Sequence, residues 1–170
     1  MVEVWFQDEA RVGQQGRLTR TWGKKGKRIR MQKDMGFEYA YIYGAICPER
    51  DVGEALVMSH VNSKVVQKHI DAINKCIPSD RHGALVMDRA PWHRSIKVPP
   101  NMTIIHLPSY SPECNPHENI WEYMKNNFLS NKVFSDFDHV MESCCEAWNK
   151  LCDEPGRIKS IGTREWAIIN

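Results

Sequence analysis

Two aspartates stand directly after short apolar segments, at points where β-strands are predicted to end. Residues 2–7 (VEVWFQ) alternate in polarity, and continuing this period places Asp8 on the same face as Phe6. Residues 84–87 (ALVM) form a continuous apolar run, typical of a central strand covered on both faces, and Asp88 follows at once. Functional side chains gather where such strand ends meet beside a change of topology. We therefore expect Asp8 and Asp88 to share one site.

A third carboxylate, Glu118, stands near the predicted start of a helix. The segment 115–118 (NPHE) has a capping residue, then proline at the first helical position and glutamate at the third. At about 100° per residue, Glu118 lies beside Trp121, at the edge of the apolar stripe of this helix. That edge can face a site at the strand ends. Glu122 is the nearest competitor, about 40° further from the stripe.

Three converging carboxylates indicate a particular chemistry. Phosphodiester cleavage requires neutralised charge on the phosphate, an activated water or hydroxyl and a stabilised leaving oxygen. Two Mg²⁺ or Mn²⁺ ions about 4 Å apart can supply all three. These ions prefer oxygen ligands, and a few carboxylates suffice because substrate and water fill the remaining positions. Since carboxylates repel one another in the absence of a cation, clustering of Asp8, Asp88 and Glu118 would itself favour a metal site.

Each carboxylate also has a purely structural interpretation. Asp8 could satisfy a turn at the end of its strand, and Asp88 could cap the short helical segment that follows it. Glu118 could cap its own helix, which would stabilise that helix by about 1 kcal/mol. Spacing alone leaves these alternatives open.

A block of basic residues extends from Arg11 to Lys33, and no acidic residue interrupts it between Glu9 and Asp34. Such a block attracts a polyanion whatever the net charge, which here is +2. The alternative is a solvated hairpin tip. The residues that we expect to contact nucleic acid are Arg17, Arg20, Lys24, Lys25, Lys27, Arg28 and Arg30, together with Lys125 and His93 outside the block.

The remaining pattern predicts the elements that must position these residues. A twisted hairpin is expected over 17–33, and further strands over 39–47, 54–61, 84–87 and 102–107. Helices are expected over 63–77 with Asn62 or Ser63 as cap, from about Pro116, and over 136–151 with Ser135 as cap. Three consecutive strands followed by strands separated by helices predict an α/β fold, a mixed sheet with helices on its faces.

The composition fits one soluble domain spanning residues 1–170. Of these 170 residues, 42% are hydrophobic and 26% charged. No apolar run approaches the roughly 18 residues that span a bilayer, and the N-terminus lacks the features of a signal peptide. The six cysteines include no C-x-x-C pair, which argues against a zinc site. A cytoplasmic location follows.

Residues 107–125 (LPSYSPECNPHENIWEYMK) closely resemble the third-carboxylate motif of DDE transposases, in particular the bacterial insertion-sequence family related to the mariner superfamily. Segments 6–9 (FQDE) and 86–93 (VMDRAPWH) resemble the segments around the first and second aspartates of that family. The matching residues of the long motif are Leu107, Pro108, Tyr110, Ser111, Pro112, Asn115, Pro116, Glu118 and Trp121. The resemblance covers essentially the whole chain.

The resemblance implies a ribonuclease-H-like fold and a DNA transposase activity. The family hydrolyses DNA at transposon ends and then joins the freed 3′-hydroxyl to target DNA. Carried over, Asp8, Asp88 and Glu118 would bind Mg²⁺ or Mn²⁺, with two ions expected, and the basic block would hold DNA. His93 would contact phosphate or the edge of the site. The protein would act in the bacterial cytoplasm, in association with the nucleoid, and a homodimer would pair two ends.

The sequence also departs from the family. Arg89 follows the second aspartate where asparagine is usual, and Cys114 and His117 occupy positions that are often aliphatic. Full-length relatives carry an N-terminal helix-turn-helix region, so we expect a separate reading frame to supply it, or the chain to be an excised domain or truncated copy. A catalytically inactive DNA-binding remnant and a ribonuclease-H-like nuclease are the alternative functions.

Overall fold

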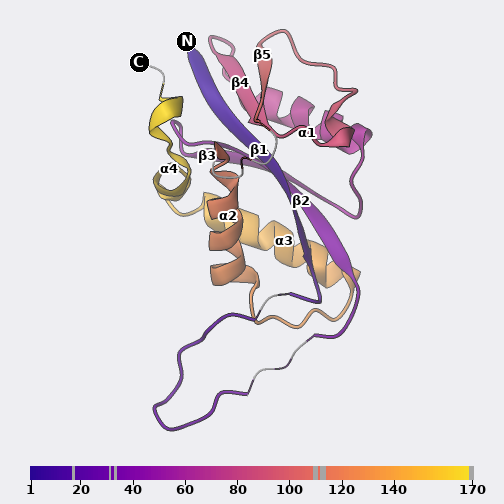
Figure 1. Ribbon diagram of the computed structural model, residues 1–170, viewed down its shortest axis with the longest axis vertical. Helices are drawn as coiled ribbons and strands as arrows, with labels where there is room; N and C mark the ends of the chain where they lie inside the picture. Colours follow the sequence, from indigo (N-terminus) through magenta and orange to yellow (C-terminus); the bar gives the residue numbers. More distant parts are fainter. Residues whose placement is uncertain (17, 31, 33, 109–110, 112–113, 169–170) are drawn as a thin grey trace.

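The computed structural model describes residues 1–16, 18–30, 32, 34–108, 111 and 114–168. Its centre is a five-stranded sheet in the order β3-β2-β1-β4-β5 (Figure 1). The strands are β1 (Val2–Gly13), β2 (Tyr39–Cys47), β3 (Val52–Met58), β4 (His82–Met87) and β5 (Met102–His106). Strand β1 pairs antiparallel with β2 and parallel with β4, while β2–β3 is antiparallel and β4–β5 parallel. The predicted mixed sheet is confirmed.

Strand β4 ends beside the middle of β1. In the parallel pairing of β1 with β4, Val2 stands opposite His82 and Phe6 opposite Val86. Two residues further on, Asp8 within β1 and Asp88 directly after β4 therefore reach the same edge of the sheet. The expectation that Asp8 lies at the end of its strand is wrong, because β1 continues to Gly13 with β2 as its partner and Asp8 pairs with Gly44.

Helices cover both faces of the sheet and create two cores. Helix α1 (Ser63–Cys76) lies on one face, packed against a cluster that contains Trp5 and Leu85. Helices α2 (His117–Met124), α3 (Phe137–Cys152) and α4 (Arg157–Gly162) lie on the other, packed against Phe6 and Val86 (Figure 1). Alternate residues of β1 enter opposite cores, as the period of two predicts.

Helix ends agree in part with the sequence predictions. Asn62 caps α1, its side chain accepting a hydrogen bond from the backbone N–H of Val65. The expectation that Ser135 caps the last long helix is wrong, because the Asp136 carboxylate accepts the hydrogen bond from the N–H of His139. The short helices α4 and Glu165–Ala167 were not predicted. Within the described residues, no helix is long and apolar enough to cross a membrane.

The basic segment does not form the predicted hairpin. The described residues of the expected hairpin, 18–30 and 32, contain no strand and extend away from the sheet as part of the loop between β1 and β2 (Figure 1). A turn does occur at Gly26, with φ of 83° and a hydrogen bond from Lys27 N–H to Lys24 C=O. Crowded like charges and the lack of a packed face disfavour regular pairing on both sides of this turn. Gln14 fastens the base of the loop, donating to Phe134 C=O and accepting from Glu38 N–H.

Gly44 allows the close contact between the sheet and the helix layer that covers the site. A Cβ atom at this position would lie 2.6 Å from the ring of Trp121 and 2.9 Å from the rings of His117 and Trp148. We predict that Gly44→Ala destabilises the fold by about 1–3 kcal/mol, the usual cost of overpacking. Urea unfolding measures the effect. Gly16→Ala, where the added atom meets only an ordinary contact of 3.4 Å, should change stability little; equal effects of the two substitutions would contradict the prediction.

Candidate functional site

A cleft of about 550 Å³ opens where β4 ends beside the middle of β1. Three carboxylates line it, those of Asp8, Glu9 and Asp88. Its other lining residues are Arg11, Tyr39, Tyr41, Ser59, His60, Val61 and Trp92. The structure thus brings together two of the three predicted site carboxylates and adds Glu9, which the sequence analysis did not select.

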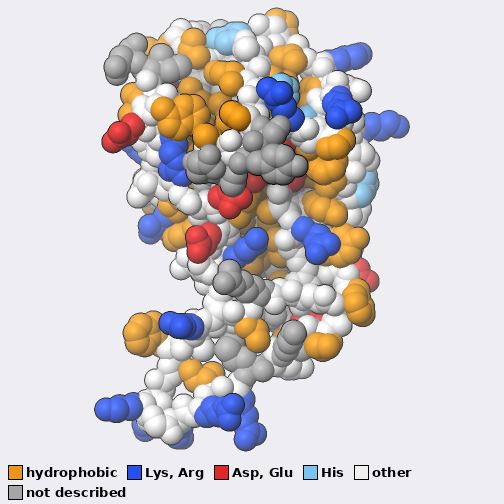
Figure 2. Space-filling model, viewed as in Figure 1, with side chains coloured by type: hydrophobic (Ala, Val, Ile, Leu, Met, Phe, Trp, Pro, Cys, Tyr) orange, Lys and Arg blue, Asp and Glu red, His pale blue; other side chains and the backbone are white. Residues whose placement is uncertain are grey.

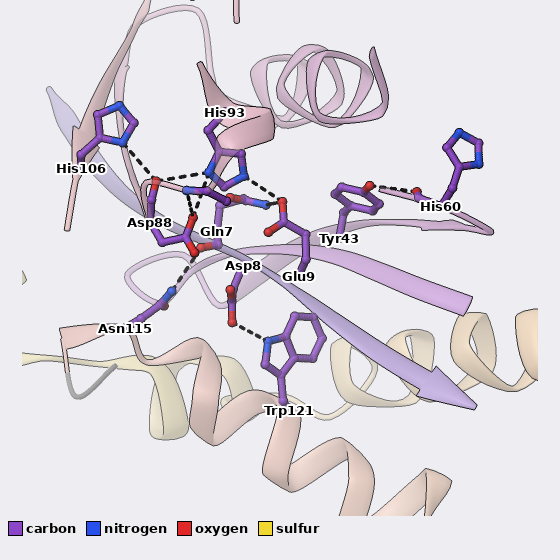
Figure 3. A network of polar contacts seen from close by, with 11 residues as sticks. Gln7, Asp8, Glu9, Tyr43, His60, Asp88, His93, His106, Asn115 and Trp121 are labelled. Atoms are coloured by element: carbon purple, nitrogen blue, oxygen red, sulfur yellow. Dashed lines mark hydrogen bonds and ion pairs between the residues drawn. The ribbon is translucent and has the colours of Figure 1, made fainter. Parts of the chain in front are cut away.

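Asp8 faces the helix layer from β1, on the same side as Phe6. Its Oδ2 accepts a hydrogen bond of 2.9 Å from the indole N–H of Trp121 in α2 (Figure 3). Burial raises the pKa of Asp8 to about 6, and the negative charges of Glu9 and Asp88 add to the rise, while the hydrogen bond from Trp121 opposes it. A cation in the cleft would relieve both the desolvation and the repulsion that disfavour the ionised form.

Asp88 is the more exposed aspartate, with 53% of its side-chain surface accessible. Its Oδ1 lies 2.9 Å from Nδ1 of His93 and accepts a hydrogen bond of 2.8 Å from the N–H of Ala90. The hydrogen bond from His93 holds the pKa of Asp88 below its ordinary value. Asp88 is therefore ionised near neutral pH.

His93 links two carboxylates beneath the cleft. Only 2% of its side chain is exposed, and its Nε2 lies 2.9 Å from Oε1 of Glu9. Burial lowers the pKa of His93, but the hydrogen bonds to Asp88 and Glu9 outweigh burial and raise it to about 10. His93 is thus a buried ring that joins β1 to the segment after β4 (Figure 3), and its expected contact with phosphate or with the edge of the site stays a prediction.

The first turn of α2 is attached directly to β1. The side chain of Asn115 donates to Gln7 C=O at 3.2 Å and accepts from His117 N–H at 3.1 Å. Asn115 thus has the predicted capping function and also sets the position of α2. Together with the Trp121–Asp8 hydrogen bond, it holds the turn that carries Glu118 close to Gln7 and Asp8 in β1.

Glu118 itself is exposed, and in the described part of the chain its carboxylate forms no hydrogen bond or ion pair. It is therefore not engaged in capping α2. Glu122 is exposed as well. Among the described residues, no group of three or more His, Cys, Asp or Glu side chains is arranged to hold a metal ion. The convergence of Glu118 with the two aspartates stays a prediction.

The predicted nucleic-acid contacts lie mainly on the loop between β1 and β2. Arg17 lies outside the described residues. The others, Arg20, Lys24, Lys25, Lys27, Arg28 and Arg30, are all exposed. Figure 2 shows Lys and Arg side chains gathered at the end of this projecting loop. Trp22, in the same loop, is fully exposed.

A second cleft, of about 390 Å³, lies at the base of this loop. Arg11 and Lys125 line it, and Arg11 also lines the cleft that holds the carboxylates. Arg11 therefore connects the acidic site with the basic loop. Arg89, beside Asp88, is exposed and does not line either cleft.

Three contributors to the site were missed from sequence: Glu9, the polar contact of Trp121 and the bridging position of Arg11. The adjacent acidic residues Asp8 and Glu9 in one strand were the available signal for Glu9, since neighbouring strand residues lie on opposite faces of the sheet. Nothing in the local sequence indicates that the Trp121 indole reaches Asp8, because that contact depends on Gly44 in a different strand.

The architecture defines a ribonuclease-H-like fold, and solved structures of the Mos1 transposase share it. A pre-cleavage Mos1 transpososome superposes with a TM-score of 0.68 at 13% identity, covering 92% of this chain and 50% of the Mos1 chain. A Mos1 paired-end complex with Mn gives a TM-score of 0.66 at 14% identity, covering 94% of this chain and 51% of that one. This chain thus spans about half the length of the Mos1 chains.

Sequence comparison gives the family. The model of the DDE superfamily endonucleases matches residues 3–141, and the chain belongs to this family. A curated relative from Sinorhizobium fredii (strain NBRC 101917 / NGR234), the uncharacterized protein y4pE/y4sA, is 45% identical over 131 residues, which are 76% of this chain and 97% of the relative. The family resemblance inferred from the sequence motifs is confirmed.

The hydrogen bond from Trp121 stabilises the ionised form of Asp8, so Trp121→Phe should raise the pKa of Asp8 above about 6. The pKa of Asp8 is 3.8 as its ordinary value and about 6 in the fold. The protonated form is therefore favoured by folding, and the fold becomes less stable as pH rises between these two values. The variant should therefore extend that loss to higher pH. Carboxyl ¹³C NMR titration measures the change. Trp148→Phe alters the same aromatic cluster without a described contact to Asp8, and a similar shift there would refute the assignment to Trp121.

Proposed function

We propose that this protein is the metal-dependent catalytic domain of a DNA transposase. It would hydrolyse phosphodiester bonds at transposon ends and transfer the freed 3′-hydroxyl to target DNA. The observation that carries the proposal is that Asp8 and Asp88 lie at the same edge of the sheet and line one cleft that is open to solvent. The family membership supports the same reaction class.

The two aspartates fit a divalent cation. Each has one oxygen held by a donor from another segment, Oδ2 of Asp8 by Trp121 and Oδ1 of Asp88 by His93. The second oxygen of Asp88 has no hydrogen bond within the described residues, which suits it for Mg²⁺ or Mn²⁺, ions that prefer carboxylate oxygen. Structures of Mos1 paired-end complexes contain Mn or Mg. We propose two such ions here.

Glu118 is the proposed third ligand. Its position in the first turn of α2 supports this assignment, because Asn115 and Trp121 tie that turn to Gln7 and Asp8. Its exposed carboxylate is not engaged by any described residue and can turn without breaking a contact. When bound, divalent ions would neutralise charge on the phosphate and activate water or a 3′-hydroxyl.

The protein's own residues would orient the DNA and keep the carboxylates in place. Arg11 and Lys125 lie between the carboxylate cleft and the basic loop, where they could hold phosphates on either side of the reacting one. The exposed basic side chains of the loop would extend this contact along the DNA. Transposon ends and target DNA are thus the proposed partners, with two copies of the chain when two ends are paired.

We predict Mg²⁺- or Mn²⁺-dependent nicking of DNA, which Asp88→Asn and Glu118→Gln each reduce by more than about 100-fold, above the range usual for outer-shell residues. Both substitutions keep the side-chain shape and remove a charged metal ligand. Nicking of a supercoiled plasmid is the measurement. Glu122→Gln, one helical turn from Glu118, is the matched control and should retain activity.

Three outcomes would count against this assignment. Loss of nicking in Glu122→Gln but not in Glu118→Gln would make Glu122 the third ligand. Unchanged nicking in Asp88→Asn would overturn the proposed site. DNA binding by the wild-type chain without any nicking would favour a DNA-binding transposase remnant.

DNA binding should weaken as salt rises, because phosphate contacts release counterions. Replacing Lys24 and Lys25 together with serine should lower the slope of log affinity against log salt by up to about 2, since each phosphate contact contributes roughly 0.9. Fluorescence anisotropy with a duplex at several salt concentrations gives the slope. Lys64→Ser/Lys68→Ser removes two exposed charges from α1 instead, and an equal fall in slope there would argue that only overall charge matters.

A further inference from the structure

The two oxygens of the Asp88 carboxylate have different surroundings. Oδ1 accepts from Ala90 N–H at 2.8 Å and lies 2.9 Å from Nδ1 of His93. Oδ2 forms no hydrogen bond with the described residues. The carboxylate is thus fixed through one oxygen, although half of the side chain is open to the cleft. An exposed aspartate without such donors would rotate freely about its side-chain bonds.

His93 can fix Asp88 only while its own ring is fixed. Its other nitrogen, Nε2, lies 2.9 Å from Oε1 of Glu9. Nδ1 also lies 3.2 Å from the backbone C=O of Asp88. All three neighbours are oxygen acceptors, so each ring nitrogen needs a proton to donate to them. The ring is almost fully buried and cannot turn toward water instead.

Glu9 is held in turn by its own strand. Its Oε1 accepts a hydrogen bond of 3.0 Å from the side chain of Gln7 (Figure 3). Only 8% of the Glu9 side chain is exposed. Glu9 extends from β1 on the face opposite Asp8, and its shared oxygen already has two donors. This arrangement suits a fixed anchor for His93 better than a metal ligand.

We propose that Glu9 and His93 are a positioning pair that fixes the Asp88 carboxylate with Oδ2 directed to the metal. The pair connects β1, which carries Asp8, to the segment that carries Asp88, so it also sets the separation of the two aspartates. The inference rests on the proposed function, since it assumes that Asp88 binds the metal. Neither Glu9 nor His93 touches the metal or the DNA in this proposal.

Positioning and simple charge effects predict opposite results at His93. An imidazolium near a cation site repels the cation, so removal of its charge alone would strengthen metal binding. Loss of positioning would weaken it, and outer-shell partners of metal ligands typically contribute 10- to 100-fold in affinity. The sign of the change therefore separates the two explanations.

Two substitutions of His93 each keep one of its two side-chain contacts, either the one with Asp88 or the one with Glu9. The amide nitrogen of asparagine corresponds in position to Nδ1 of histidine and that of glutamine to Nε2. His93→Asn can therefore still donate to Asp88, whereas His93→Gln can donate only to Glu9. Both remove the positive charge and leave a polar side chain in place.

The experiment measures Mn²⁺ affinity of the full chain by electron paramagnetic resonance, without DNA. We expect binding about 10- to 100-fold weaker in His93→Gln and clearly less affected in His93→Asn. Asp88→Asn should abolish binding at this site. His82→Asn, at the far end of β4, is the histidine control and should bind as the wild type does. Thermal unfolding in chelator checks that each variant folds.

A double-mutant cycle tests Glu9 and does not depend on His93→Gln being folded. Glu9→Gln should weaken Mn²⁺ binding in the wild-type chain but change it little in the His93→Asn chain, where asparagine cannot reach Glu9. An equal loss in both backgrounds would show that Glu9 acts directly through its charge, which would overturn the pair.

The outcomes separate the two levels of the proposal. If wild-type binding depends on Asp88 but His93→Gln binds equally well or more tightly, the positioning pair is wrong and the metal site stands. If His93→Asn and His93→Gln lose equal affinity, the contact with Asp88 is not the cause and the pair is also wrong. If Asp88→Asn leaves Mn²⁺ binding unchanged, the metal site falls and the inference falls with it.

Discussion

The parallel pairing of β1 with β4 is the constraint on which the site depends. Its register, with Phe6 opposite Val86, brings Asp8 and Asp88 to the same edge of the sheet. A shift by one residue would move one carboxylate to the opposite face, because side chains alternate along a strand. The two cores resist such a shift, since Phe6 and Val86 are buried in one of them and Trp5 and Leu85 in the other. Burial of apolar side chains thus fixes the position of the acidic ones.

The same sheet edge holds its two aspartates in different electrostatic states. Asp8 lies against the helix layer, where burial raises its pKa, while Asp88 is open to the cleft and bonded to His93, which lowers its pKa. His93 adds one buried positive charge between Glu9 and Asp88. This charge compensates part of the repulsion among the carboxylates and leaves the cleft negative. Such a cleft attracts cations, whereas the distant loop presents positive charge to a polyanion.

The arrangement separates the proposed chemical site from the proposed DNA-holding surface. Asp8 stands on the central strand of the sheet and Asp88 directly after the neighbouring strand β4, and packing on both faces of the sheet limits the movement of these two strands. The basic side chains stand on an exposed loop whose base is fastened by Gln14. Rigid elements suit groups that must hold a metal. Long exposed side chains suit contacts with the phosphates of a DNA backbone, whose path can vary. Arg11 lies in both clefts and connects the two regions.

The sequence by itself determined the strand and helix order, the mixed sheet, the face on which Asp8 lies and the family. Those features follow from periodicity and from a long local motif, which the chain carries wherever it folds. The tertiary structure alone decided the contacts between distant segments: Trp121 with Asp8 over Gly44, and His93 between Glu9 and Asp88. No local pattern encodes these contacts, because each joins residues from separate elements. The hairpin expected in the basic segment failed for a related reason, since turn residues predict a bend but pairing needs a packed face.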